Sequence, residues 1–272
     1  MSTPPPIRRM KAALGRIRYR AYLPHTTLPI SFAEGVSISD QFLYRGDIAA
    51  NRFVAENTLA LLLGEPLEVT HRLIFFDADG RHLCEQSHLR SSYFDTIDIE
   101  PIDVAYATYV HTTSYAKSSL LVEELRSLQR HHRGYSLFKR TSDSVFAAVH
   151  GNFGGIATDG SRTMARHQLL ARHRSPFLYT PQHRFTKGDS VWLYVMNSCS
   201  SRETVEVILP ETEHEPEPRI HTSLSIPSLG VGRCVLHGVE GYLSFRSRLP
   251  MCRPLVFVER ADNRHHFDVF HT

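Results

Sequence analysis

The sequence contains no long apolar run, and this absence excludes a membrane-spanning helix. None of its 272 residues lies in a stretch of 18 or more consecutive apolar side chains, whereas a helix that crosses a bilayer needs about 20. Residues 1–6 are polar and rich in proline, and no apolar segment with a cleavage site follows them. We therefore expect no signal peptide and a cytoplasmic protein.

Cysteine is also scarce, and none of the four cysteines forms a CxxC pair. They stand far apart, at Cys84, Cys199, Cys234 and Cys252. This spacing gives neither a zinc knuckle nor a disulfide framework. The motifs of serine hydrolases, zinc proteases and phosphate-binding loops are missing as well. The sequence therefore identifies no catalytic residue, and we expect no cofactor unless a divalent metal ion is bound.

Acidic side chains are missing from residues 1–33, which form a basic N-terminal arm. The six basic residues of the arm are Arg8, Arg9, Lys11, Arg16, Arg18 and Arg20. The rest of the chain carries three more acidic than basic side chains, which does not favour nucleic acid as a partner. Apolar residues recur in the arm at the spacing of a short amphipathic helix. We expect the arm to bind an anionic membrane surface peripherally or another acidic partner. The alternative is that it docks on the chain's own acidic body or stays mobile.

Alternation of apolar and polar side chains is the strongest pattern in the sequence. Residues 67–75 place apolar side chains on one face and polar side chains on the other, which is typical of a half-buried strand. Residues 77–80 then supply a turn that ends on Gly80, a residue able to adopt positive φ, so a hairpin is predicted. The same alternation recurs in residues 191–195 and 205–209.

Short strands separated by turns, at a spacing of about ten residues, predict a mostly β fold. We expect two tandem β-sandwich units, immunoglobulin-like or jelly-roll-like, over residues 34–184 and 185–272. One short crossover helix is expected near 118–133. Residues 134–139 resemble residues 241–246, which favours a duplication, although chance similarity is the alternative.

His150, Gly151 and Asn152 form the first candidate ligand site. A predicted strand runs there into a glycine-rich turn that continues to Gly155. Glycine lets backbone amides approach a ligand, and the two polar side chains are able to donate hydrogen bonds to a sugar, an anion or a carbonyl group. The alternative is a simple bend at the end of a sandwich.

Histidine is frequent, with 17 residues, so a metal site is the second hypothesis. On a strand, His266 and Asp268 project to the same face and form one arm of a site for a divalent ion. His271 projects to the opposite face of a regular strand and does not complete a triad. The alternative is an edge strand with exposed polar side chains.

We expect a non-catalytic binding or assembly protein, because sandwich folds commonly carry function in their end loops. Its partner would be a glycan, a lipid-linked intermediate or a protein. Two alternatives remain open: a metal-dependent enzyme that uses histidine and aspartate ligands, and a homo-oligomeric structural subunit paired through sheet edges. The fold by itself implies no function.

Overall fold

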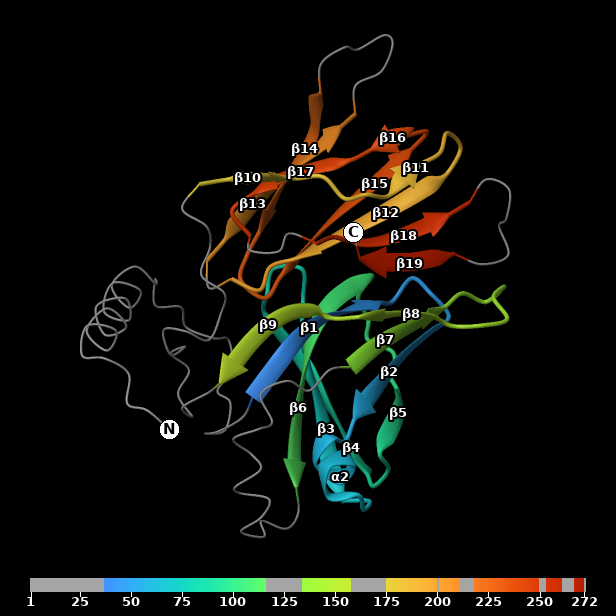
Figure 1. The fold of residues 1–272 in the computed structure, drawn as a ribbon, viewed down its shortest axis with the longest axis vertical. Coiled ribbons are helices and arrows are strands. Elements are labelled where there is room, and N and C mark those ends of the chain that lie inside the picture. Colours follow the sequence, from blue (N-terminus) through green and yellow to red (C-terminus); the bar gives the residue numbers. More distant parts are fainter. Residues whose placement is uncertain are drawn as a thin grey trace, which may run out of the picture.

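Antiparallel strands dominate the computed structural model of the chain (Figure 1). The structure describes residues 37–115, 134–157, 175–199, 201–210, 218–249, 253–260 and 267–271. The prediction of a mostly β fold is confirmed, and the described residues contain one short helix, α2 (Thr58–Leu63). No described helix is long and apolar enough to span a membrane. The basic arm and the helix expected near 118–133 lie outside the described residues.

The first half of the chain forms two antiparallel sheets. The five-stranded sheet has the order β4 (His82–Arg90), β3 (Val69–Phe76), β6 (Tyr106–Tyr115), β1 (Ser37–Arg45) and β9 (Asn152–Ala157). The four-stranded sheet has the order β5 (Phe94–Asp98), β2 (Ala50–Glu56), β7 (Gly134–Lys139) and β8 (Ala147–His150). The predicted hairpin is confirmed, since β3 and β4 pair and Gly80 between them has a φ of +74°.

The second half forms three further sheets. One has the order β10 (Phe177–Tyr179), β17 (Ser244–Ser247), β13 (Glu203–Leu209) and β14 (Arg219–Ile226). Another has the order β15 (Val231–His237), β12 (Ser190–Met196), β18 (Leu255–Glu259) and β19 (Asp268–His271). The third pairs β11 (Arg184–Phe185) with β16 (Gly241–Tyr242). Among the described strands, β9 pairs with β1 of the first half, whereas β10 pairs with β17 of the second half. The unit boundary at residue 185 stays a prediction.

The two segments that look alike in sequence occupy different places in the fold. Residues 134–139 form the single strand β7, whereas residues 241–246 are divided between β16 and β17, which belong to different sheets. Strand β7 pairs with β8, the strand that follows it. Strand β17 pairs with β10 and β13, and the strand that follows it, β18, lies in another sheet. The likeness therefore does not mark equivalent positions.

The first half buries an aromatic cluster between its two sheets. Phe42, Phe75 and Tyr109 come from the five-stranded sheet, and Phe53 comes from the facing sheet. The ring centroids of Phe42 and Phe53 lie 4.9 Å apart, and those of Phe75 and Tyr109 lie 5.1 Å apart. Edge and tilted ring contacts of this kind add to the free energy gained by burying apolar area.

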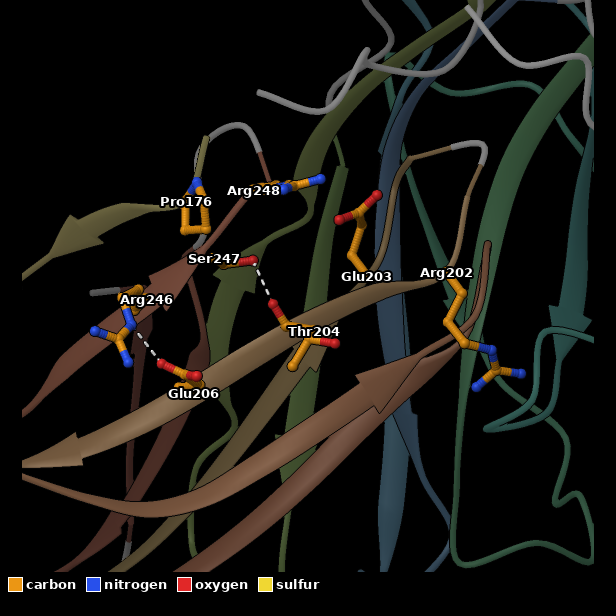
Figure 2. Close-up of a pocket in the computed structure, with 8 residues that line it drawn as sticks. All are labelled: Pro176, Arg202, Glu203, Thr204, Glu206, Arg246, Ser247 and Arg248. Carbon is orange, nitrogen blue, oxygen red and sulfur yellow. Dashed lines mark hydrogen bonds and ion pairs between the residues drawn. The ribbon is translucent and has the colours of Figure 1, made fainter. Parts of the chain in front are cut away.

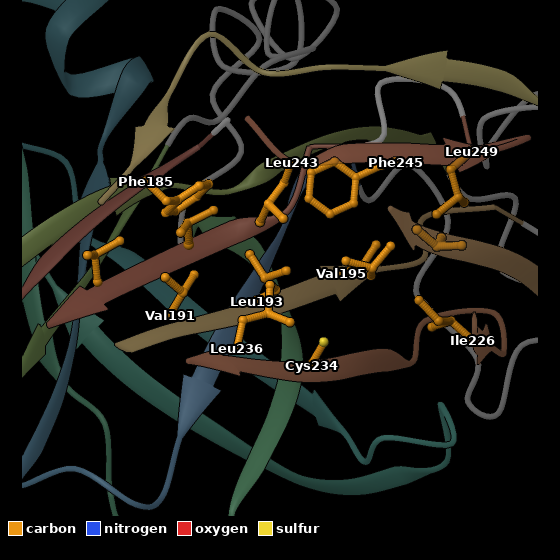
Figure 3. Packing of buried hydrophobic residues seen from close by; sticks show 14 of the residues in the cluster. Phe185, Val191, Leu193, Val195, Ile226, Cys234, Leu236, Leu243, Phe245 and Leu249 are labelled. Atoms are coloured by element: carbon orange, nitrogen blue, oxygen red, sulfur yellow. The ribbon is translucent and has the colours of Figure 1, made fainter. Parts of the chain in front are cut away.

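The second half buries an aliphatic cluster between its two larger sheets (Figure 3). Val205 and Phe245 project from β13 and β17, and Val191 and Leu193 project from β12 on the other side. All four side chains are fully or almost fully buried. The alternation that predicted strands at residues 191–195 and 205–209 is thus confirmed.

A third cluster joins the two halves. Leu43 and Phe138 of the first half pack with Tyr194 and Phe257 of the second half, and the rings of Phe138 and Phe257 lie 5.0 Å apart. The guanidinium carbon of buried Arg45 lies 4.5 Å from the centroid of the Phe257 ring, a cation–π contact across the junction. The four larger sheets accordingly form a four-bladed, propeller-like arrangement rather than the two sandwiches expected. The expectation of two separate sandwiches missed the third cluster, because nothing local in the sequence shows that the two halves, each with its own core, also pack against each other.

Two turns from different halves dock against each other at this junction. The turn between β14 and β15 meets the β3–β4 turn, where the Val231 amide donates a hydrogen bond to the Ala78 carbonyl at 3.2 Å. The Gln41 side-chain amide donates to the Leu229 carbonyl at 2.9 Å. Leu229 has a φ of +62°, a left-handed conformation that is costly for a residue with a branched side chain and persists only where surrounding contacts impose it.

Replacement of Gly80 by alanine tests this docking. A Cβ atom at Gly80 would lie 2.0 Å from the Ser228 carbonyl oxygen. The left-handed conformation alone costs alanine about 1–2 kcal/mol, and the clash adds to this cost, so we expect the free energy of unfolding to fall by about 3 kcal/mol. Gly238→Ala is the matched control, because Gly238 has a φ of +68° and no atom within 4 Å of a built Cβ. Urea unfolding measures both variants, and equal losses would contradict the close contact between the turns.

Candidate functional site

The residues of the first candidate site lie where the chain passes from one sheet to another. His150 ends β8, Asn152 begins β9, and Gly151 between them is buried. A Cβ atom on Gly151 would lie 2.7 Å from both the Cβ of Asp40 and the Cε1 of Phe42. Glycine therefore lets the backbone pass close to β1. Packing within the chain accounts for this glycine, and a ligand-binding role for the three residues stays a prediction.

His150 contacts the second half of the chain. Its ring centroid lies 4.3 Å from that of His271 on β19, and the His271 Nε2–H donates a hydrogen bond to the His150 carbonyl. Burial lowers the pKa of His271 to about 4, so this imidazole is neutral at pH 7. The pair connects β8 to β19 across the junction between the halves.

The second candidate site is described only in part. His266 lies outside the described residues, and the Asp268 carboxylate lies 3.0 Å from the Arg260 Nε. Among the residues that the structure describes, no group of three histidine, cysteine, aspartate or glutamate side chains could hold a metal ion. A metal at His266 and Asp268 therefore stays a prediction.

A buried network of ionisable side chains lies in the first half. His71 on β3 contacts Asp95 on β5 through Nε2, at 2.8 Å from Oδ2, and His111 on β6 through Nδ1, at 2.9 Å from Nε2. All three residues are almost completely buried. The His111 ring also lies 4.8 Å from the Phe53 ring, so the network borders the aromatic cluster.

The carboxylate of Asp95 fixes the proton positions in this network. A carboxylate only accepts hydrogen bonds, so the His71 Nε2 carries a proton and the neutral His71 ring accepts from His111 at Nδ1. Desolvation by burial lowers the pKa of His71, and the hydrogen bond and charge of Asp95 oppose this effect without cancelling it. Because each group satisfies another, we interpret the network as structural.

An arginine-rich hollow lies on the sheet β10-β17-β13-β14 (Figure 2). Its lining residues are Pro176, Arg202, Glu203, Thr204, Glu206, Arg246, Ser247 and Arg248. The hollow encloses about 300 Å³, which is the lower end of the roughly 300–1,000 Å³ usual for ligand pockets. Its charged lining is unlike the apolar walls of most small-molecule sites.

Strand alternation places the arginines of this hollow toward solvent. Val205 and Val207 of β13 and Phe245 of β17 point into the aliphatic cluster, so neighbouring residues with the opposite parity point outward. Glu206 and Arg246 are two of these residues, lie opposite each other in the register and form an ion pair. Figure 2 shows this pair at one side of the hollow.

Arg248 is the unpaired cation of the hollow. It makes no hydrogen bond or ion pair with any residue in the described ranges. Glu203, shown near it in Figure 2, is buried and accepts a hydrogen bond from the Ser201 hydroxyl at 2.6 Å. Three arginines and two glutamates leave the hollow with one formal positive charge. This arrangement suits a ligand with a carboxylate, sulfate or phosphate group.

The sequence holds signals for both features, although the predictions missed them. His71 occupies the apolar face of its strand, between Val69 and Leu73, where alternation demands an inward side chain. A histidine on such a face indicates a buried polar partner. Arg246 and Arg248 likewise occupy outward positions. The other side of the hollow comes from β13, which is distant in the sequence, since Glu206 and Arg246 are 40 residues apart.

Comparison with protein-family models, with curated proteins and with solved structures finds no match for this chain. Its function is therefore argued from the site alone.

The buried network predicts how stability depends on pH. The folded pKa of His71 lies below its usual value of 6.5, so protonation favours the unfolded chain. The free energy of unfolding should therefore be fully retained above pH 6.5 and fall as the pH drops below 6.5 toward the folded pKa. In His71→Phe we expect the free energy of unfolding to fall by about 1–3 kcal/mol at pH 8, because Asp95 and His111 lose their partner. Below pH 6.5 this variant should lose less additional stability than the natural protein does. Urea unfolding at pH 8, 7, 6 and 5 measures the free energy of unfolding of the natural protein and of His71→Phe. If this free energy changed with pH equally in both proteins, the pH dependence would not come from His71.

Proposed function

We propose that this chain is a non-catalytic binding protein that holds an anionic group of its ligand in the arginine-rich hollow. The observation that carries the proposal is Arg248, a half-buried guanidinium without a described partner in a hollow that two further arginines line. An unpaired guanidinium in a hollow retains its donors for a ligand. Its planar fork matches the oxygens of a carboxylate, sulfate or phosphate group.

The neighbouring groups support an anion with hydroxyl substituents. Arg246 is neutralised by Glu206, so it contributes orientation rather than a free charge. Thr204 adds a hydroxyl group to the rim, and Ser225, which lies opposite it in the register, adds another. A glycan with an acidic group combines the two chemistries, which agrees with the glycan partner expected from the sequence. The hollow lies on a sheet face and not in the end loops where a site was expected.

The other functional hypotheses also remain proposals. A protein partner, an anionic membrane bound by the basic arm and a cytoplasmic location are compatible with the hollow but do not depend on it. A metal-dependent enzyme would need His266 and Asp268 together with further ligands, and a homo-oligomeric subunit would need a pairing edge. The hollow favours neither of these two alternatives.

Substitution of Arg248 tests the proposal directly. We expect inorganic sulfate to bind the natural protein with a dissociation constant in the millimolar range, as typical of a single charged contact site. Arg248→Ala should weaken this binding about 10-fold or more, because a charge-assisted hydrogen bond contributes about 1.5–3 kcal/mol. Arg248→Lys should recover part of the affinity, since lysine keeps the charge and loses the fork. Isothermal titration calorimetry or chemical-shift titration measures the change.

The matched control is Arg184→Ala. Arg184 is an exposed arginine of the same half that pairs with Glu240 away from the hollow. Its removal changes the net charge equally and should leave sulfate affinity unchanged. Equal weakening in both variants would show a non-specific charge effect, and absence of any sulfate binding by the natural protein would refute the proposal.

A further inference from the structure

The polar surface of the hollow continues across the outer face of its sheet. Thr204 lies opposite Ser225, and Glu206 lies opposite Ser223, in the register of β13 and β14. Residues opposite each other in an antiparallel pair share a face, and Thr204, Ser223 and Ser225 are all exposed. Hydroxyl groups therefore extend from the hollow toward the β14 edge.

Arg202 lies at the far end of this hydroxyl row. Its Nη1 lies 3.4 Å from the Ser225 carbonyl oxygen and 3.5 Å from the Ser225 hydroxyl, so the exposed side chain extends over β14. Figure 2 shows Arg202 and Arg246 at opposite ends of the set of lining residues. Ser247, which precedes Arg248, lies opposite Val205 in the register of β13 and β17. Arg202 precedes Val205 by three positions, which on a strand is about 10 Å. The face thus presents cationic groups at two separated points.

Aromatic side chains of these strands point the other way. Phe177, Tyr179 and Phe245 pack against or belong to the aliphatic cluster, and none of the described outward residues at the hollow is aromatic. Ligands that depend on base stacking, such as single-stranded nucleic acids, need aromatic platforms. A ligand on this face would be held mainly by charge and by hydrogen bonds to hydroxyl groups, beside the one exposed apolar residue of β10, Leu178, which lies opposite Arg246.

We propose that the ligand is an acidic polysaccharide chain, sulfated or carboxylated, that lies along this face from Arg248 and Arg246 to Arg202. This inference rests on the proposed function and adds the class and the minimum length of the ligand. One acidic group occupies the hollow beside Arg248, a second contacts Arg202, and sugar hydroxyls between them bond to Thr204 and Ser225. An acidic peptide fits less well, because an extended peptide would pair with an exposed strand edge and not lie on a sheet face.

Ligand length is the variable that tests the inference. Heparin-derived di-, tetra-, hexa- and octasaccharides are titrated into the natural protein, together with inorganic sulfate. We expect affinity to rise at least about 10-fold once the oligosaccharide spans both points, because the second contact becomes intramolecular, and to level off for longer chains. Arg202→Ala should remove this gain and leave sulfate affinity unchanged, whereas Arg248→Ala should weaken every ligand. Arg184→Ala is again the control and should change neither quantity.

The outcomes separate this inference from the proposed function. Sulfate binding that depends on Arg248, combined with equal affinity for all oligosaccharide lengths, would overturn the extended ligand and leave the anion site standing. Loss of sulfate binding altogether would overturn both. Polyglutamate peptides and phosphatidylserine vesicles are tested in the same way. If either binds more tightly than the octasaccharide and this binding depends on Arg202, the ligand is a protein or a membrane and the inference is refuted.

Discussion

Burial of the inner faces of β13 and β17 determines which residues of these two strands face solvent. Val205, Val207 and Phe245 are fully buried, and each such side chain contributes about 1.5–3 kcal/mol of hydrophobic stabilisation. A shift of register by one residue would expose these side chains and bury Arg246 and Glu206 instead. The cost of such a shift fixes which residues of both strands point inward, and Arg246 and Glu206 therefore face solvent.

The junction between the halves adds a second constraint of the same kind. Arg45 is buried and lies over the Phe257 ring of the other half, and the left-handed Leu229 receives a hydrogen bond from Gln41. Burial of an arginine and a left-handed leucine both cost free energy. The contacts that offset these costs form only when the halves are docked. The halves therefore stabilise each other, which is why the description as two independent sandwiches failed.

Local patterns in the sequence predicted the strands well and the site poorly, for a physical reason. Alternation is a property of consecutive residues, so residues 67–75 and 191–195 identified β3 and β12 nearly to their ends. The turn at Gly80 was likewise predictable from backbone preference alone. The contact between Gln41 and Leu229 joins residues 188 positions apart, and the sequence around either residue does not predict it. The hollow depends on such a long-range pairing, between β13 and β17, so its arginines looked like ordinary surface charges.

Several of the described histidines make hydrogen bonds or packing contacts within the chain. His71 hydrogen-bonds both Asp95 and His111 in the core, and the His271 ring lies against the His150 ring at the junction. His183 lies 4.2 Å from the Phe270 ring and packs as an aromatic. These contacts give the imidazoles structural roles, and within the described part of the chain they leave the His183 Nε2 and His271 Nδ1 atoms without a hydrogen-bond partner. Arg248 has no partner among the described residues, and this is the observation behind the anion site proposed above.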